Sequence, residues 1–195
     1  MASERFSQHL EDLVSGSSPK TLQILIDHFA EKSFAVLFLL LMAIPALPLP
    51  TGGITHIFEI IVMLLALELI VGRRTIWLPK KWRKLELPKK VQTSTLPGLI
   101  KLIRKVEKYS RPRLESLINH SLFNKILGLT VLTLALSAFL APPFTGLDTL
   151  PSLSVVLISL AVILDDIIVA IIGAVVGVVG IGLILALGSL VFKLL

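Results

Sequence analysis

Residues 45–53 read PALPLPTGG and interrupt an apolar run that extends from Ser33 to Gly72 without a single Lys or Arg. Proline cannot continue a helix and glycine tolerates positive φ, so this segment predicts a turn between two helices. The helices are expected at about Ser33–Leu47 and Ile54–Gly72. The first would be about 22 Å long, short of the ~30 Å hydrocarbon core of a bilayer, whereas the second just reaches across it. The pair is therefore either a tight transmembrane hairpin or a re-entrant one.

The same pattern recurs later in the chain. A third apolar helix is expected at about Leu122–Leu140, the segment Ala141–Gly146 breaks it, and a fourth helix follows at about Leu150–Leu164. A shift of 94 residues superimposes the two breaks, pairing Pro48 with Pro142, Thr51 with Thr145 and Gly52 with Gly146. Either the chain contains an internal repeat or two Pro-Gly turns resemble each other by chance. Paired, interrupted apolar segments are typical of the binding sites of transporters.

The composition excludes most classes of soluble protein. Of 195 residues, 54% are hydrophobic and 16% charged, and the mean hydropathy is +0.89. Soluble domains contain about 25% charged residues, so the chain is expected to be an all-α integral membrane protein. Continuous apolar runs argue against a membrane β-barrel, in which the residues would alternate. The absence of Cys excludes disulfides and thiolate metal sites.

Most of the positive charge lies between the two interrupted regions. Fifteen of the nineteen Lys and Arg residues fall between Arg73 and Lys125, against three acids, which gives a local charge of 15 − 3 = +12. This is the pattern of a cytoplasmic loop, which predicts a cytoplasmic N-terminus and, with five spans, a C-terminus outside. No base-reading or stacking motif accompanies the charge, so nucleic acid is not an expected partner.

Within this connector, residues 96–111 have the spacing of a basic amphipathic helix that lies in the membrane plane. Its cations, with the arginines after the second helix, are expected at a membrane surface containing anionic lipid. This basic set comprises Arg73, Arg74, Lys101, Arg104, Lys105 and Lys108.

The two ends of the chain contain further helical patterns. A short amphipathic helix is expected to start at Ser18-Pro19, and a long Gly-rich helix at about Ile167–Phe192. The spacing Gly173-x-x-x-Gly177 allows close helix packing, either within the chain or across a homodimer. The expected segments are an N-terminal amphipathic region (1–32), a first hairpin (33–72), a basic connector (73–121), a second hairpin (122–166) and a last helix (167–195).

The charged side chains in the apolar windows 33–72 and 126–192 are all acidic. Ionisable groups inside a bilayer are costly and indicate ion sites or proton relays, unless they lie at the interface and are merely solvated. Together with the breaks they form the candidate ion or transport site: Pro48, Pro50, Thr51, Gly52, Gly53, Glu59, Glu68, Pro142, Pro143, Thr145, Gly146, Asp165 and Asp166. Asp148, in the second turn, and His56, near the first break, are weighed beside them. No catalytic, cofactor or metal motif is present, so neither an enzyme nor a cofactor is expected.

An ordered set of motifs resembles the ExoD family of bacterial inner-membrane proteins linked to exopolysaccharide synthesis. The set comprises residues 47–53 (LPLPTGG), Leu64–Glu68, Gly72-Arg73-Arg74, Trp77-Leu78-Pro79, Arg111–Leu114 and the acidic junction at Asp165-Asp166. Glu68 stands where the family pattern implies Gln, and Glu59 where it implies a small or apolar residue.

Three functions follow from these features and from the resemblance. The first is transport of a small ion or polar solute at the helix breaks in support of exopolysaccharide production. The second is a scaffold or regulator that contacts exopolysaccharide machinery through the basic connector, and the third is handling of lipid-linked sugars. The resemblance implies a multi-pass protein of the bacterial inner membrane.

Overall fold

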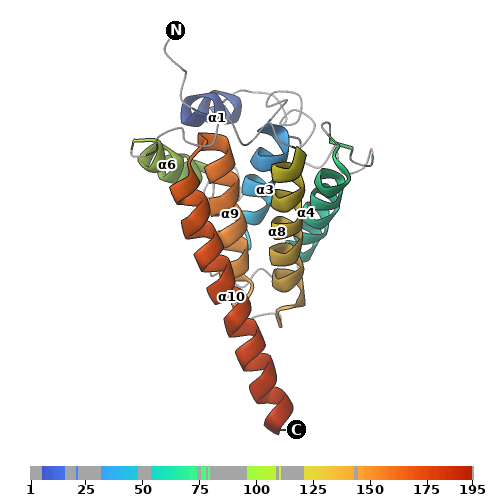
Figure 1. Ribbon diagram of the computed structural model, residues 1–195. Coiled ribbons are helices and arrows are strands. Elements are labelled where there is room, and N and C mark those ends of the chain that lie inside the picture. Colours follow the sequence, from blue (N-terminus) through green and yellow to red (C-terminus); the bar gives the residue numbers. More distant parts are fainter. Residues whose placement is uncertain are drawn as a thin grey trace.

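Figure 1 shows the computed structural model as a bundle of long helices with two short helices lying across one end. The structure describes residues 6–15, 32–47, 54–73, 96–108, 121–142 and 145–194, with single positions between them. All the regular elements in this part of the chain are α-helices: α1 (Phe6–Ser15), α3 (Ser33–Met42), α4 (Ile54–Val71), α6 (Leu96–Glu107), α8 (Ser121–Leu140), α9 (Thr149–Leu164) and α10 (Ile167–Leu194).

Two helices form the centre of the bundle. Every residue of α3 is buried, as are most residues of α9, and the two pack against each other. Around them, α4 packs on α8 and α10 packs on α9. The chain runs down α3, up α4, down α8, up α9 and down α10, so both hairpins begin and end at the end of the bundle where α1 and α6 lie (Figure 1).

The outer helices expose apolar stripes that a soluble bundle would bury. On α4 the stripe recurs every three or four residues, at Ile57, Ile60, Leu64, Leu67 and Val71. A similar stripe follows α8, and α10 exposes apolar side chains along most of its length. Two segments, Leu122–Leu140 and Ile167–Leu187, are long and apolar enough to cross a membrane. Large contiguous apolar surfaces of this kind indicate association with a membrane.

Three glycines allow α10 to approach α9 closely. A Cβ atom at Gly173 would lie 2.8 Å from Ile158 Cγ1, and one at Gly177 would lie 2.5 Å from Ser154 Oγ. At Gly180 it would lie 2.9 Å from Leu150 Cβ and equally close to the ring of Pro151. Of the two alternatives that the sequence left open for this small-residue spacing, packing within the chain and packing across a homodimer, the structure shows the first. Gly182 has no atom within 4 Å of the same position and takes no part in this contact.

The helix bounds agree with the predictions at most positions, with one clear correction. The first apolar helix ends at Met42 instead of near Leu47, and Ala43–Ala46 continue as turns. Pro45 explains the early end, because proline disfavours helical geometry at the residue before it. At about 15 Å, α3 covers half of a ~30 Å hydrocarbon core.

The two short helices α1 and α6 differ from the sequence-based predictions in part. Helix α1 was not predicted, and it packs against α6, where Glu107 accepts hydrogen bonds from Ser7 N (2.9 Å) and Ser7 Oγ (2.6 Å). Helix α6 begins at Leu96, as predicted, and ends at Glu107, four residues before the expected Arg111. The helix expected to start at Ser18-Pro19 lies outside the described residues, apart from the isolated position Thr21, as does the turn at residues 48–53.

Candidate functional site

A fully buried carboxylate lies near the end of the bundle where the hairpins turn. Glu59 is on the second turn of α4 and is 0% exposed. Its Oε2 atom is 2.8 Å from Nδ1 of His56, one turn earlier on the same helix. Its Oε1 atom is also buried and has no hydrogen-bond partner among the residues that the structure describes. A buried carboxylate is costly unless its oxygens are paired, so this one requires an explanation.

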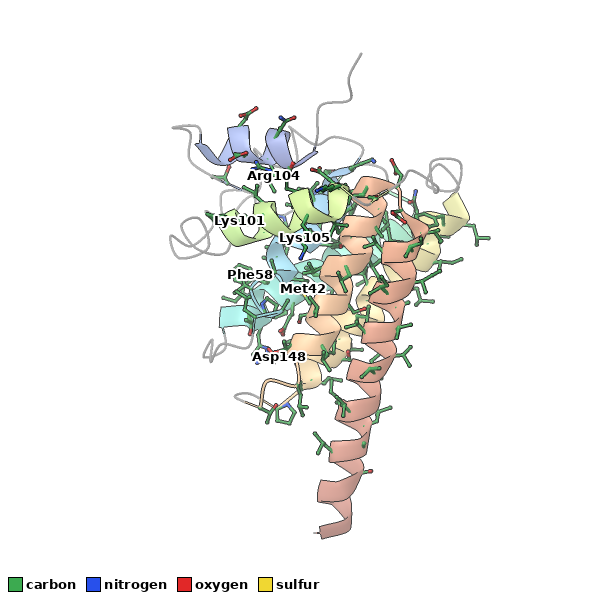
Figure 2. The ribbon with its side chains drawn as sticks, turned by 90° about the vertical axis from the view of Figure 1, so that its left-hand side faces the viewer. Met42, Phe58, Lys101, Arg104, Lys105 and Asp148 are labelled. Atoms are coloured by element: carbon green, nitrogen blue, oxygen red, sulfur yellow. The ribbon has the colours of Figure 1, made fainter. Side chains whose placement is uncertain are left out.

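Residues from the second hairpin complete the surroundings of Glu59. The Phe139 ring, in the last turn of α8, makes an edge-on contact with the His56 imidazole at a centroid distance of 5.1 Å. Asp148, immediately before α9, lies within electrostatic range of Glu59 and adds a second negative charge. Figure 2 places Asp148 at the end of the bundle opposite to the labelled α6 cations Lys101, Arg104 and Lys105. The site therefore combines side chains from both hairpins.

A polar stripe runs along α9 from this site. Ser152 and Ser159 are fully buried, and their hydroxyl oxygens have no hydrogen-bond partner within the described part of the chain. Ser152 is four residues after Asp148 and Ser159 is seven residues after Ser152, which puts all three side chains on one helical face. The α10 glycines approach Leu150, Pro151, Ser154, Leu157 and Ile158, which are centred on another face of α9, and the burial of both serines shows that the stripe is directed into the rest of the bundle.

The acidic pair at the end of α9 has a structural role. Asp165 caps α9 in a left-handed conformation (φ 56°), which Asp tolerates better than most residues. Its carboxylate pairs with Lys32 Nζ at 3.0 Å, and the same ammonium group donates to the Ile163 carbonyl at 2.8 Å. Asp166 is buried and accepts a hydrogen bond from Ile168 N at the start of α10. Both carboxylates therefore stabilise the α9–α10 junction.

Glu68 also has a local partner. Its Oε2 atom accepts a hydrogen bond from Trp77 N at 2.8 Å, which attaches the segment after α4 to the last turn of that helix. Glu68 is nine residues from Glu59, in the last turn of α4, and α4 ends at the side of the bundle where α1 and α6 lie (Figure 1). The two glutamates of α4 thus have different surroundings, one in a turn at the basic end and one buried near the hairpin turns.

The second break forms an exposed turn. Thr145 Oγ1 donates to the Pro142 carbonyl at 2.6 Å, and Gly146 adopts the positive φ of 71° that the sequence predicts for a glycine there. The hydroxyl of Thr145 is therefore engaged within its own turn. The remaining predicted break residues lie outside the described part: Pro48, Pro50, Thr51, Gly52, Gly53 and Pro143.

The cations of the connector lie together on the exposed side of α6. Lys101, Arg104, Lys105 and Lys108 are exposed, whereas Leu99, Ile100 and Ile103 are buried. Arg104 forms an ion pair with Glu11 of α1. Arg73, just after α4, is exposed as well, and Arg74 is outside the described residues. Helix α6 has the predicted division into an apolar and a basic face, and its apolar face packs on the protein. Its predicted placement in the membrane plane stays a prediction.

Comparison with known proteins places the chain in a family. The family model described as "Exopolysaccharide synthesis, ExoD" matches residues 6–186. The chain belongs to the ExoD family. The family is thus one involved in exopolysaccharide synthesis, as the resemblance implied.

Two curated relatives of this ExoD-family chain have the same level of identity. It is 29% identical over 170 residues to the Synechocystis protein named "Uncharacterized protein slr1875", covering 83% of this chain and 77% of the relative. It is also 29% identical over 147 residues to "Protein ExoD" of Rhizobium meliloti, covering 75% of this chain and 61% of that protein. The match thus leaves more than a third of the Rhizobium protein without a counterpart. No solved structure matches the chain.

Sequence reasoning on this ExoD-family chain found Glu59 but not the group around it. His56 is three residues before Glu59, a spacing that puts both on one helical face. For Asp148 the sequence indicates only a residue in a turn, and it contains no signal for Phe139. Their proximity depends on the packing of α4 on α8, which periodicity does not reveal.

Proposed function

We propose that this ExoD-family protein transports a small ion or polar solute through the bundle, in support of exopolysaccharide production. The observation that supports this most is the Glu59 carboxylate, which is fully buried and has one oxygen without a partner in the described residues. Natural proteins keep such a costly group where it has a function, and ionisable groups in membrane bundles mark ion and substrate pathways.

The polar stripe on α9 supports a route for the solute. Asp148, Ser152 and Ser159 offer oxygen atoms at successive depths along α9, in a bundle whose buried side chains are mostly apolar. The short helix α3 supports the same proposal, because its carbonyl end and the following turn lie within the bundle, with Ala43 and Pro45 buried. Interrupted helices of this kind expose backbone groups to a substrate in transporters.

The proposed topology is multi-pass, with the α1–α6 end at the cytoplasmic face. The exposed cations of α6 and Arg73 lie at that end, which agrees with the tendency of Lys and Arg to remain inside. The hairpin turns with Asp148 would then face outward, and the end of α10 would also lie outside. The matching order of α3–α4 and α8–α9 favours a repeat of two parallel copies.

Flux measurements on proteoliposomes test the proposal. We expect purified protein to move ions or small solutes down an imposed gradient, and Glu59→Gln to reduce the rate at least about tenfold, the usual consequence of losing a charged hydrogen-bonding group. The amide has nearly the same size as the carboxylate, so packing is preserved. A flux equal to that of empty vesicles, from protein shown to be folded, would refute transport.

The matched control is Glu68→Gln on the same helix. It makes the same chemical change, and the amide oxygen can still accept the hydrogen bond from Trp77 N. We expect this variant to keep the wild-type flux. Equal losses in the two variants would show that Glu59 has no special place in the pathway.

A second candidate function rests on the basic face of α6. Four exposed cations lie on it, and they suit anionic lipid headgroups or an acidic partner in the exopolysaccharide machinery. We expect replacement of Lys101, Lys105 and Lys108 by Gln to weaken retention of phosphatidylglycerol during purification, by about 1 kcal/mol per cation near the surface. Arg104 is left intact because it pairs with Glu11. Unchanged lipid retention combined with loss of a co-purifying synthase would favour the scaffold instead.

A further inference from the structure

We infer that the ligand of the Glu59 site is a monovalent cation that competes with a proton for this carboxylate. The inference rests on the proposed function and narrows its substrate class from small ions and polar solutes to alkali-type cations. Three features support it: the sign of the fixed charge, the number of carboxylates and the free oxygen of Glu59.

The sign of the net charge around Glu59 is determined by side chains. At this end of the bundle α3 and α8 finish while α4 and α9 begin, so their opposite helix dipoles offset each other (Figure 1). The remaining charges are the carboxylates of Glu59 and Asp148, which repel each other, and the His56 imidazole, which attracts Glu59 when it is protonated. An anion placed here would add a third negative charge, whereas a cation would relieve the repulsion.

The number of carboxylates favours a monovalent cation over a divalent one as the ligand. Divalent cations prefer several oxygen ligands with more than one carboxylate bound directly. In the described residues no group of three or more His, Cys, Asp or Glu side chains could hold a metal ion. Of the two carboxylates only that of Glu59 is fully buried, whereas Asp148 is partly exposed and can be screened by water, so one positive charge balances the buried part of the site. Unwound backbone carbonyls supply further ligands of Na⁺ sites in interrupted-helix transporters.

The free oxygen of Glu59 is the proposed point of contact. Oε2 is occupied by His56 Nδ1 at 2.8 Å, while Oε1 is buried without a partner in the described part of the chain. An ionised carboxylate only accepts hydrogen bonds, so His56 must be the donor when Glu59 is charged, and Oε1 is then left for a cation. When Glu59 is protonated instead, its negative charge is lost and the cation is released.

The groups around Glu59 allow a proton to replace the cation. Helix α4 contributes His56 and α9 is preceded by Asp148, whereas α8 brings the apolar Phe139 ring. The sequence of α3 contains no charged residue, and Lys125, the cation of α8, is in the first turn of that helix, at the other end from Phe139. No Lys or Arg is therefore positioned to replace the cation among the described residues of these helices.

Thermal unfolding of the full-length protein in detergent tests the inference separately from transport. The probes are LiCl, NaCl and KCl, each titrated against N-methyl-D-glucamine chloride at constant ionic strength. We expect at least one alkali cation to raise the unfolding temperature in a saturable manner, because a ligand that binds only the folded state stabilises it. Lowering the pH should weaken the apparent affinity, by up to about tenfold per pH unit once Glu59 is mostly protonated.

Variants decide whether the stabilisation comes from this site. Glu59→Gln should weaken the apparent affinity at least about tenfold, Asp148→Asn should weaken it less, and Glu68→Gln should leave it unchanged. Equal cation responses in wild type and Glu59→Gln, or no response to any of the three salts, would overturn the inference. Solute flux without a cation response would also overturn it while leaving transport intact, whereas a Glu59-dependent response without flux would support cation binding and reject transport.

Discussion

Gly180→Leu should destabilise the bundle by about 1–3 kcal/mol or more, the cost of forcing extra methylenes into a packed interface. A Cβ atom at this position would already lie 2.9 Å from Leu150 Cβ, 2.9 Å from Pro151 Cδ and 3.0 Å from Pro151 N. A proline ring and a backbone nitrogen cannot rotate away, so α10 would have to separate from α9. The measurement is the free energy of unfolding in mixed detergent micelles, compared with the wild-type chain.

Gly182→Leu is the matched control for this change. It makes the same substitution two residues later on α10, where no atom lies within 4 Å of the added Cβ. The substitution should be neutral or slightly stabilising, since leucine is a better helix former than glycine by about 0.5–1 kcal/mol. Similar losses at both positions would mean that the contact between α9 and α10 does not determine the stability of the bundle.

Glu59→Met should have the opposite effect and raise the stability of the protein while abolishing its flux. The carboxylate is fully buried, and one of its oxygens has no partner in the part of the chain that the structure describes. An apolar side chain of similar length removes that penalty, which is about 1–3 kcal/mol for a buried unsatisfied polar group. His56 is 36% exposed at its side chain, so water can satisfy its imidazole after the change. Unfolding is measured in buffer free of alkali cations.

Glu68→Met provides the comparison for the stability effect. This substitution removes the acceptor of the Trp77 N–H hydrogen bond and should lower stability by about 0.5–1.5 kcal/mol, the net value of one such bond. The two glutamates of α4 should therefore differ in the sign of their effects. A loss of stability in Glu59→Met would show that the carboxylate oxygens are well paired in the folded protein. It would contradict the view that the buried carboxylate lowers stability and is retained for its function.

Hydropathy and turn residues predicted the helices but not their arrangement. Long apolar runs bounded by Pro and Gly placed α4, α8, α9 and α10 within a few residues of their bounds. Leu96 was predicted correctly as the start of α6 because its apolar residues share one face. The sequence could not show that α3 packs against α9, because α3 is apolar on nearly every side and periodicity gives such a helix no preferred partner.

The candidate site was predictable only in part. Glu59 is conspicuous because an acid in an apolar helix is costly, and the same argument applied to Glu68, Asp165 and Asp166. The tertiary structure separates them: Trp77 N, Lys32 and Ile168 N pair with Glu68, Asp165 and Asp166, in that order, whereas Oε1 of Glu59 has no hydrogen-bond partner among the described residues. These partners come from neighbouring segments or distant helices, so a single sequence contains no signal for them.

The complete burial of α3 has a consequence for the order in which the protein is assembled in the membrane. At about 15 Å the helix is too short to be held by the lipid alone, and its principal contact, α9, is synthesised more than 100 residues later. We therefore expect α3 to reach its final position only after α9 has entered the membrane. Until then the first hairpin would need temporary protection, so nascent chains that stop before Thr149 should be preferred substrates of membrane quality-control proteases.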